Sequence, residues 1–202
     1  MARILVLFAH PAFEKSRVHK EMVKYASHIE GVTFHDLYET YPDYDIDRAR
    51  EQHLLLQHDI IVMQHPFYWY SCPAILKEWQ DLVLEHGWAY GHGGTQLAGK
   101  FLFNAITAGG REDVYQETGY NRFTIKQLLA PFDQTSYLCK MTYLPPFVVH
   151  DTHRMNHAGI ELHAQQYQQL LIGLKEDKIS LSEPEKIKYM NDLVPATKAL
   201  KL

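Results

Sequence analysis

The chain opens on the stretch RILVLFAHP, residues 3–11, an unbroken apolar run that ends at a histidine and a proline. A run of this length without polar alternation is typical of a strand buried on both faces of a parallel sheet. We therefore predict a central strand here. Ser16 then precedes apolar residues at helical spacing, with Gly31 as the stop, so a loop and a helix follow the strand.

The unit of strand, loop and helix recurs. Further strands are predicted at 32–37, 59–64 and 100–107, with a last strand region between 137 and 150. Helices are predicted at 47–57, 73–83, 122–129 (stopped near Pro131) and 156–174. This alternation predicts an α/β fold, a flavodoxin-like doubly wound five-stranded parallel sheet of order 2-1-3-4-5 with helices on both faces. Residues 1–175 form the predicted domain, and residues 176–202 form a loosely attached C-terminal tail or docking arm.

Composition limits the classes of function. The 202 residues carry a net charge of −4 and are 46% hydrophobic, as in an ordinary globular protein. They contain no Lys/Arg-rich run of the kind that binds nucleic acid. No apolar stretch approaches the roughly 20 residues that span a bilayer, and residues 1–9 lack the features of a secretory signal. Cys72 and Cys139 occur in unrelated contexts, which favours a reducing compartment, so a cytoplasmic protein is expected.

Three loops should carry the chemistry, because ligands of such sheets bind beyond the carboxyl ends of the strands. The first loop, residues 10–19, brings Ser16 and unpaired backbone amides to the start of a helix. Such a helix end favours a phosphate, and Arg17 and His19 are candidates for additional positive charge. The open alternative is that Ser16 acts only as the helix N-cap.

The other two loops follow the strands predicted at 59–64 and 100–107. Residues 67–70 are four aromatic residues in a row, which either stack beside a flat heteroaromatic ligand or fill the core under the sheet edge. The amides of Trp69 and Tyr70 would reach the polar edge of such a ligand. Gly109 and Gly110 either let the main chain approach a ligand closely or form a simple turn. Three ligand-compatible loops in register favour a binding site.

Short segments spread in order from Ala9 to Phe147 carry a family resemblance. They are Ala9-His10-Pro11, Leu37 through Pro42-Asp43 and Ile46-Asp47, 64–66, 70–74, 76–79, 87–94, 97–100 and 144–147. At these residues the chain resembles the NAD(P)H:quinone oxidoreductase (DT-diaphorase) family. It is most similar to the bacterial branch, the ancillary flavoproteins of glutathione-regulated potassium efflux systems.

The resemblance implies a bound FMN or FAD, NAD(P)H as hydride donor and a quinone as acceptor. It assigns the flavin phosphate to His10, Ser16, Arg17, Val18 and His19. It places the isoalloxazine between Pro66, Phe67, Tyr68, Trp69 and Tyr70 on one loop and Thr107, Ala108, Gly109 and Gly110 on another. Tyr115 matches the position whose hydroxyl supports negative charge on the flavin. The resemblance also implies a homodimer in which Trp88, Tyr90 and His92 line the pocket of the opposite subunit.

Departures from the family pattern leave the function open. Asn121, the second candidate catalytic residue beside Tyr115, stands where many relatives have a histidine. Asparagine can donate a hydrogen bond but cannot shuttle a proton at neutral pH, so slow turnover is expected. His19 stands where asparagine is common, and Tyr68 stands where some relatives have glutamine.

Three functions therefore compete. The first is a flavin-dependent NAD(P)H:quinone oxidoreductase, and the second is a regulatory subunit that binds a potassium efflux transporter at the inner face of the membrane. The third, a one-electron flavodoxin, is disfavoured because the net charge of −4 is modest.

A metal site is not predicted. His150, His153 and His157, with Asp151 among them, have spacings that a metal could use. No cysteine accompanies them, and the segment runs from a strand end to a helix start, so solvated histidines or histidines at the rim of a pocket are the better interpretation.

Overall fold

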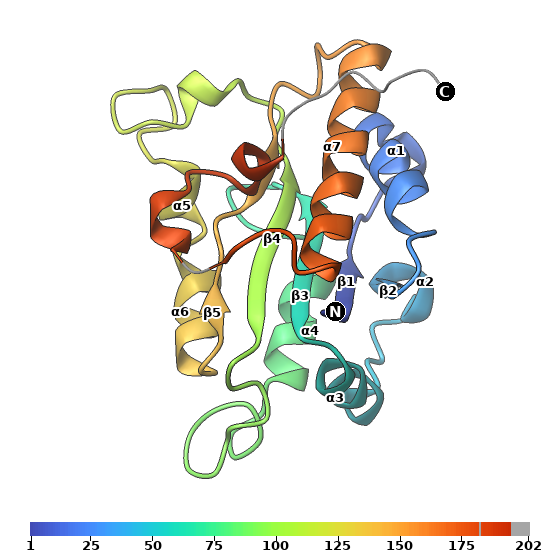
Figure 1. Cartoon of the computed structure of the whole chain (residues 1–202), viewed down its shortest axis with the longest axis vertical. Coiled ribbons are helices and arrows are strands. Elements are labelled where there is room, and N and C mark those ends of the chain that lie inside the picture. Colours follow the sequence, from blue (N-terminus) through green and yellow to red (C-terminus); the bar gives the residue numbers. More distant parts are fainter. Residues whose placement is uncertain (182, 195–202) are drawn as a thin grey trace.

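A parallel β-sheet forms the centre of the computed structural model, which describes residues 1–181 and 183–194 (Figure 1). Its strands are β1 (Ile4–Phe8), β2 (Val32–Asp36), β3 (Ile60–Pro66), β4 (Phe101–Thr107), β5 (Thr142–Tyr143) and β6 (Phe147–Val149). They lie in the order β2-β1-β3-β4-β5, all parallel, and β6 also pairs with β4. The predicted doubly wound sheet of order 2-1-3-4-5 is confirmed.

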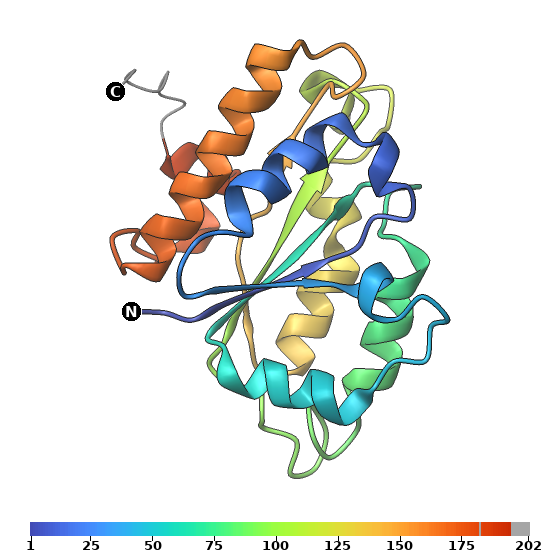
Figure 2. The same ribbon diagram turned by 90° about the vertical axis from the view of Figure 1, so that its right-hand side faces the viewer.

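Helices cover both faces of the sheet (Figure 2). They are α1 (Arg17–Ala26), α2 (Leu37–Thr40), α3 (Arg48–Gln57), α4 (Ala74–Val83), α5 (Ile125–Leu128), α6 (Ala130–Leu138) and α7 (His157–Lys175), with the short helices η1 (Phe13–Lys15), η2 (Glu112–Val114), η3 (Pro184–Lys186) and η4 (Met190–Leu193). Alternate side chains of β1 enter opposite cores: Ile4 packs with α1 and α7, and Leu5 packs with the layer of α3, α4 and α6. Within the described residues, no helix combines the length and the apolarity needed to cross a membrane.

The fifth position of the sheet is divided into two short strands. β5 pairs with the start of β4 and β6 pairs with its end, and Leu144, Pro145 and Pro146 lie between them. Proline lacks the amide that a ladder needs, so two consecutive prolines interrupt the pairing.

The helix predicted at 122–129 is wrong in its extent. Thr124 begins α5 with a capping box that involves Gln127, and α5 ends at Leu128. A second helix, α6, then runs from Ala130 to Leu138, with Pro131 in its first turn. Proline is tolerated there because the first helical amides have no partner within the helix, so Pro131 belongs to a helix start rather than to a stop.

The loose attachment predicted for the C-terminal tail does not hold for residues 189–194. Met190 is fully buried with α7 and β6, and the side chain of Asn191 bonds to the main chain of Val148. The division of the chain at residue 175 stays a prediction. Residues 195–202 of the proposed docking arm lie outside the described residues.

Candidate functional site

The three predicted loops meet at the carboxyl edge of the sheet around one cavity. This main cavity encloses about 520 Å³, which is within the range usual for small-molecule and cofactor sites. Its lining residues are His10, Ala12, Lys15, Ser16, Arg17, Val18, Pro66, Phe67, Tyr68, Trp69, Thr107, Gly109, Thr152 and His153. Ten of the residues that the family resemblance assigned to the flavin are in this set.

One end of the main cavity is built to receive an anion. The Ser16 hydroxyl accepts a hydrogen bond from the His19 amide at 3.2 Å and so caps α1. The amides at the start of α1 have no acceptor within the helix and carry its positive dipole end. Lys15 and Arg17 add two cations, and the first turn of α1 has no acidic residue. Ser16 acts as the N-cap and also lines the cavity, so the two alternatives for this residue coexist.

His19 does not add charge to this end. Its side chain is fully buried behind the cavity, with Nε2 3.0 Å from Thr107 Oγ1 and Nδ1 3.3 Å from Gln64 Nε2. Burial holds the pKa of His19 well below its usual value, and His10 and His65 lower it further. The imidazole is therefore neutral at physiological pH, and it links α1 to β3 and β4. The prediction that His19 supplies charge to a phosphate is wrong, because the helix turns the ring toward the sheet.

The aromatic loop is a strained turn. The main-chain φ angles of Trp69 and Tyr70 are 49° and 63°, and the Ser71 amide donates to the Tyr68 carbonyl oxygen at 3.0 Å. Two left-handed residues in succession are characteristic of a type I′ turn, which normally takes Asn-Gly. In the part of the chain that the structure describes, the amides of Trp69 and Tyr70 donate no hydrogen bond. Trp69 is 92% exposed, so this turn presents its ring and two free amides beside the cavity instead of filling the core.

An adjacent cavity of about 480 Å³ continues from the main one. The two share Phe67, Trp69, Gly109 and His153, and the adjacent cavity is also lined by Tyr70, Gly110, Val114, Tyr115, Tyr120 and Asn121. Both predicted catalytic residues therefore lie here, although Asn121 Oδ1 already accepts a hydrogen bond from the Tyr70 hydroxyl at 3.2 Å. Burial, helped by Tyr70, raises the pKa of Tyr115, so its hydroxyl stays protonated at neutral pH.

Two of the residues predicted to bind the flavin line neither cavity. His19 lies behind the main cavity, as described above, and Ala108 is buried, with its amide donating to Val149. Both members of the glycine pair lie close to neighbouring side chains: a Cβ atom at Gly109 would come within 2.5 Å of the His153 ring, and one at Gly110 within 2.9 Å of the Val114 side chain.

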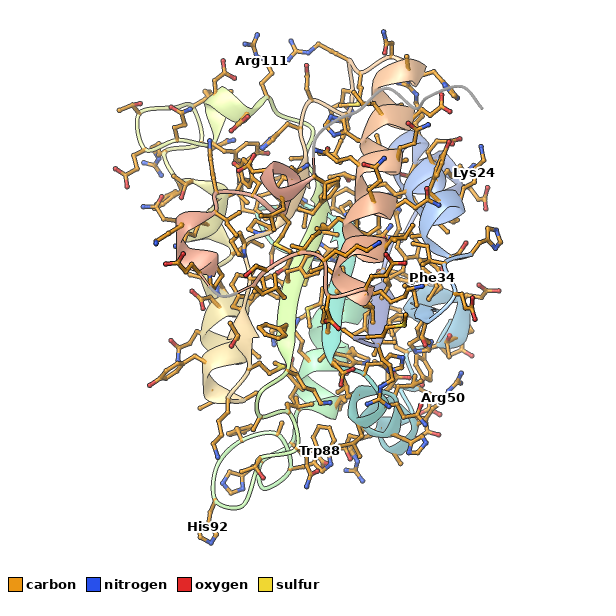
Figure 3. All side chains as sticks on the ribbon, viewed as in Figure 1. Lys24, Phe34, Arg50, Trp88, His92 and Arg111 are labelled. Atoms are coloured by element: carbon orange, nitrogen blue, oxygen red, sulfur yellow. The ribbon has the colours of Figure 1, made fainter. Side chains whose placement is uncertain are left out.

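Trp88, Tyr90 and His92 lie at the other end of the molecule. Figure 3 shows Trp88 and His92 at the amino edge of the sheet, opposite Arg111 at the carboxyl edge. They cannot line the cavity of their own chain. Their predicted place in the pocket of a second subunit stays a prediction.

Sequence reasoning missed Ala12, Lys15 and Thr152 and placed His153 only at a possible rim. Thr152 and His153 follow β6, so the rule that ligands bind beyond strand ends points to them as well. The signal was present, but the position of the last strand was too poorly defined to use it. Among the described residues, no three His, Cys, Asp or Glu side chains are grouped to hold a metal ion.

The sequence of the chain matches a known protein family and curated relatives. The family model for a flavodoxin-like fold matches residues 2–171. The glutathione-regulated potassium-efflux system ancillary protein KefG of Enterobacter sp. (strain 638) is 45% identical over 166 residues, which cover 82% of this chain and 91% of that protein.

Solved structures give the same fold under different names. The general stress protein 14 from Treponema denticola, in complex with FMN, has a TM-score of 0.79 and 36% identity and covers 85% of this chain and 99% of its own. An NADPH-quinone reductase from P. pentosaceus has a TM-score of 0.75 and 33% identity, with coverages of 83% and 96%. A protein described as a thermophilic tryptophan halogenase from Streptomycin violaceusniger has a TM-score of 0.80 and 44% identity, with coverages of 82% and 96%. Because these names differ, the likeness supports a common fold rather than one reaction.

Proposed function

The chain belongs to the family of flavodoxin-like fold whose model spans residues 2–171, and from this membership we propose that it binds FMN and transfers hydride from NAD(P)H to a quinone or a similar electrophile. One observation carries the proposal. The cavity at the carboxyl edge joins an anion-binding helix start to a strained aromatic turn with free amides. These are the two kinds of surface that a phosphate and a flat heteroaromatic ring require.

The donors present suit FMN. Ser16, Arg17 and Val18 would hold the phosphate, with Lys15 as an additional cation. The turn at 66–70 and the segment 107–110 would enclose the ring system from two sides. The relative from Treponema denticola was solved with FMN, which favours FMN over FAD for this chain.

The chain's own groups would support the reaction by orientation and hydrogen bonding. When bound, FMN would supply a ring that accepts hydride from the nicotinamide and returns it to the acceptor. The amides of Trp69 and Tyr70 and the protonated hydroxyl of Tyr115 are donors that can stabilise negative charge on that ring. Asn121 is bonded to Tyr70, so in this proposal it orients Tyr70 rather than moving a proton.

A homodimer belongs to this proposal. Trp69 is 92% exposed and Tyr120 is 90% exposed, both beside the cavities, and a second copy would cover them. Trp88, Tyr90 and His92 belong to the loop that precedes the start of β4, at the edge of the sheet opposite the cavities, so they would reach a cavity only in that second copy.

A second candidate function is a regulatory ancillary subunit of a potassium efflux transporter. Two observations favour it: the 45% identity to KefG of Enterobacter sp., and an asparagine at 121 that cannot shuttle a proton. In this role the protein would stay in the cytoplasm, at the inner face of the membrane, and be held there by the transporter.

The visible spectrum separates the two candidates. The purified protein should be yellow, lose its colour with NADPH or NADH and regain it with a quinone, and heating should release FMN that chromatography identifies. Tyr115→Phe should slow the reaction about a hundredfold, because one donor near developing charge is lost. Tyr137→Phe is the matched control, because Tyr137 is 77% exposed on α6 and lines neither cavity. A colourless protein that cannot take up FMN but co-purifies with a transporter would favour the second function.

A further inference from the structure

The chain continues beyond the part that it shares with its family. The family match ends at residue 171, and α7 ends at Lys175. Figure 1 shows the chain leaving the lower end of α7, crossing the same side of the sheet and rising to the short helix η4. We call residues 188–194 the C-terminal strap.

Specific contacts anchor the strap. The Met190 side chain is fully buried, and its amide donates a hydrogen bond to the Pro146 carbonyl oxygen at 3.0 Å. Asn191 bonds to both main-chain groups of Val148, accepting from its amide at 2.8 Å and donating to its carbonyl oxygen at 3.1 Å. Gln166 on α7 donates to the carbonyl oxygens of Asn191 and Val194 at 3.0 and 2.8 Å.

These contacts close the edge of β6. An edge strand presents amides and carbonyls that need partners, and Asn191 supplies a donor and an acceptor where the next strand would. A segment with a buried apolar anchor and satisfied polar groups has a defined position. The strap is therefore part of the folded domain.

The strap also reaches the candidate site through a row of rings. The centroid of the Tyr189 ring lies 5.7 Å from that of His150, and the His150 ring lies 5.7 Å from that of Tyr115. Both ring nitrogens of His150 are buried and, among the described residues, have no hydrogen-bond partner. Burial also lowers the pKa of His150, so the ring is neutral and serves as a packing layer between the two tyrosines.

An ion pair joins the strap to the loop that carries Tyr115. Lys188 Nζ lies 2.5 Å from Glu112 Oε1, and Glu112 begins η2, the short helix just before Tyr115. Both side chains are at least half exposed, so this pair alone fixes little. Together with the ring row it gives the strap two contacts with the loop that carries Tyr115.

We infer that Tyr189 is a positioning residue: the strap presses its ring on His150 and thereby fixes the orientation of Tyr115 in the adjacent cavity. The effect on flavin chemistry rests on the proposed function, but the effect on the loop does not. A site that lies within the family match would thus be completed by a segment outside that match.

The first test uses the flavin-free full chain. Tyr189→Ala should increase amide hydrogen exchange in residues 110–122 at least fivefold, with β1 unchanged, and Tyr189→Phe should restore the wild-type rate. Lys188→Gln should have a smaller effect, and Lys186→Gln is its matched control, because the described ion pair of Lys186 is with Glu183, three residues away in the same segment. If Tyr189→Ala does not fold, Tyr189→Leu keeps the apolar volume and removes the ring. Unchanged exchange in 110–122 when the strap itself loosens would overturn the inference.

The second test uses the FMN-loaded protein and separates positioning from mere stability. Tyr189→Ala should shift the midpoint potential of bound FMN in the same direction as Tyr115→Phe, and the double variant should shift no further. An additive double variant would overturn the inference. If the wild type binds no FMN, the proposed function fails, but the exchange result still decides whether the strap orders the Tyr115 loop.

Discussion

The strained turn at Trp69 and Tyr70 allows a prediction in which stability and binding change in opposite directions. Trp69 has a φ of 49° and is 92% exposed, so it holds a left-handed backbone while its side chain makes few contacts within the chain. A left-handed residue other than Gly or Asn costs about 1–2 kcal/mol. Trp69→Asn should therefore raise the free energy of unfolding by about 1 kcal/mol.

The neighbouring residue should behave differently. Tyr70 has a φ of 63°, but its ring packs on Phe67 at 6.4 Å and its hydroxyl bonds to Asn121. An aromatic contact of this kind is worth about 0.5–1.5 kcal/mol. In Tyr70→Asn the gain from relieved backbone strain should therefore cancel the loss of this contact, and the free energy of unfolding should stay the same. For Trp69→Asn, the lost contact with bound FMN should instead weaken binding roughly fivefold, from about 1 kcal/mol of stacking.

The assay is urea unfolding of the flavin-free protein, followed by FMN titration. Tyr120→Asn is the stability control, because Tyr120 is 90% exposed but is not among the described residues with positive φ. The control should leave the unfolding free energy unchanged. If Trp69→Asn gave no more stability than Tyr120→Asn, the turn would store no strain and the reasoning would fail.

Three further predictions concern buried polar groups. His19→Leu and Gln64→Leu should each lower the unfolding free energy by about 2 kcal/mol, because each leaves the other side chain buried without its hydrogen-bond partner. The double variant should lose only about 1 kcal/mol, and additive losses in urea titrations would contradict this. Burial lowers the pKa of His65 from 6.5 to about 4. As the pH falls from 6.5 to about 4, the unfolded state therefore takes up a proton that the folded state does not, and the free energy of unfolding should fall by about 3 kcal/mol. His65→Asn should flatten the plot of unfolding free energy against pH, and an unchanged slope would assign the effect to other groups. Tyr167→Phe should leave stability unchanged or raise it by about 1 kcal/mol, because the hydroxyl is buried and has no partner among the described residues; a clear loss would reveal a bond to that hydroxyl.

Much of the fold could be predicted because strand burial leaves a direct signal. Runs such as Ile4–Phe8 are apolar without alternation, and only a sheet covered on both faces requires that. Prolines were harder to interpret, since the same residue stops a helix, begins one or divides a strand, depending on which amide is already unpaired. Pro131 and Pro146 show two of these outcomes within one short segment.

The candidate site was predictable where chemistry follows strand ends and unpredictable where it depends on tertiary contact. Ser16 and Thr107 follow from the topology, because the carboxyl ends of parallel strands meet at one edge. Nothing in the sequence around Trp69 indicates a left-handed turn, since tryptophan has no preference for it. The strap escaped prediction because its apolar residues, among them Met190 and Val194, form no long periodic run, and only their packing against α7 and β6 gives them a place.

The histidines at the edge of the sheet show why charge patterns mislead at such a site. His10, His19 and His65 all have pKa values lowered first by burial, so they act as neutral rings. A neutral imidazole has one nitrogen that donates a hydrogen bond and one that accepts, so it can connect two structural elements, each of which presents one polar group. His19 does so between Gln64 and Thr107, with Nδ1 3.3 Å from Gln64 Nε2 and Nε2 3.0 Å from Thr107 Oγ1. The buried ring therefore connects α1 to β3 and β4 and adds no charge to the cavity.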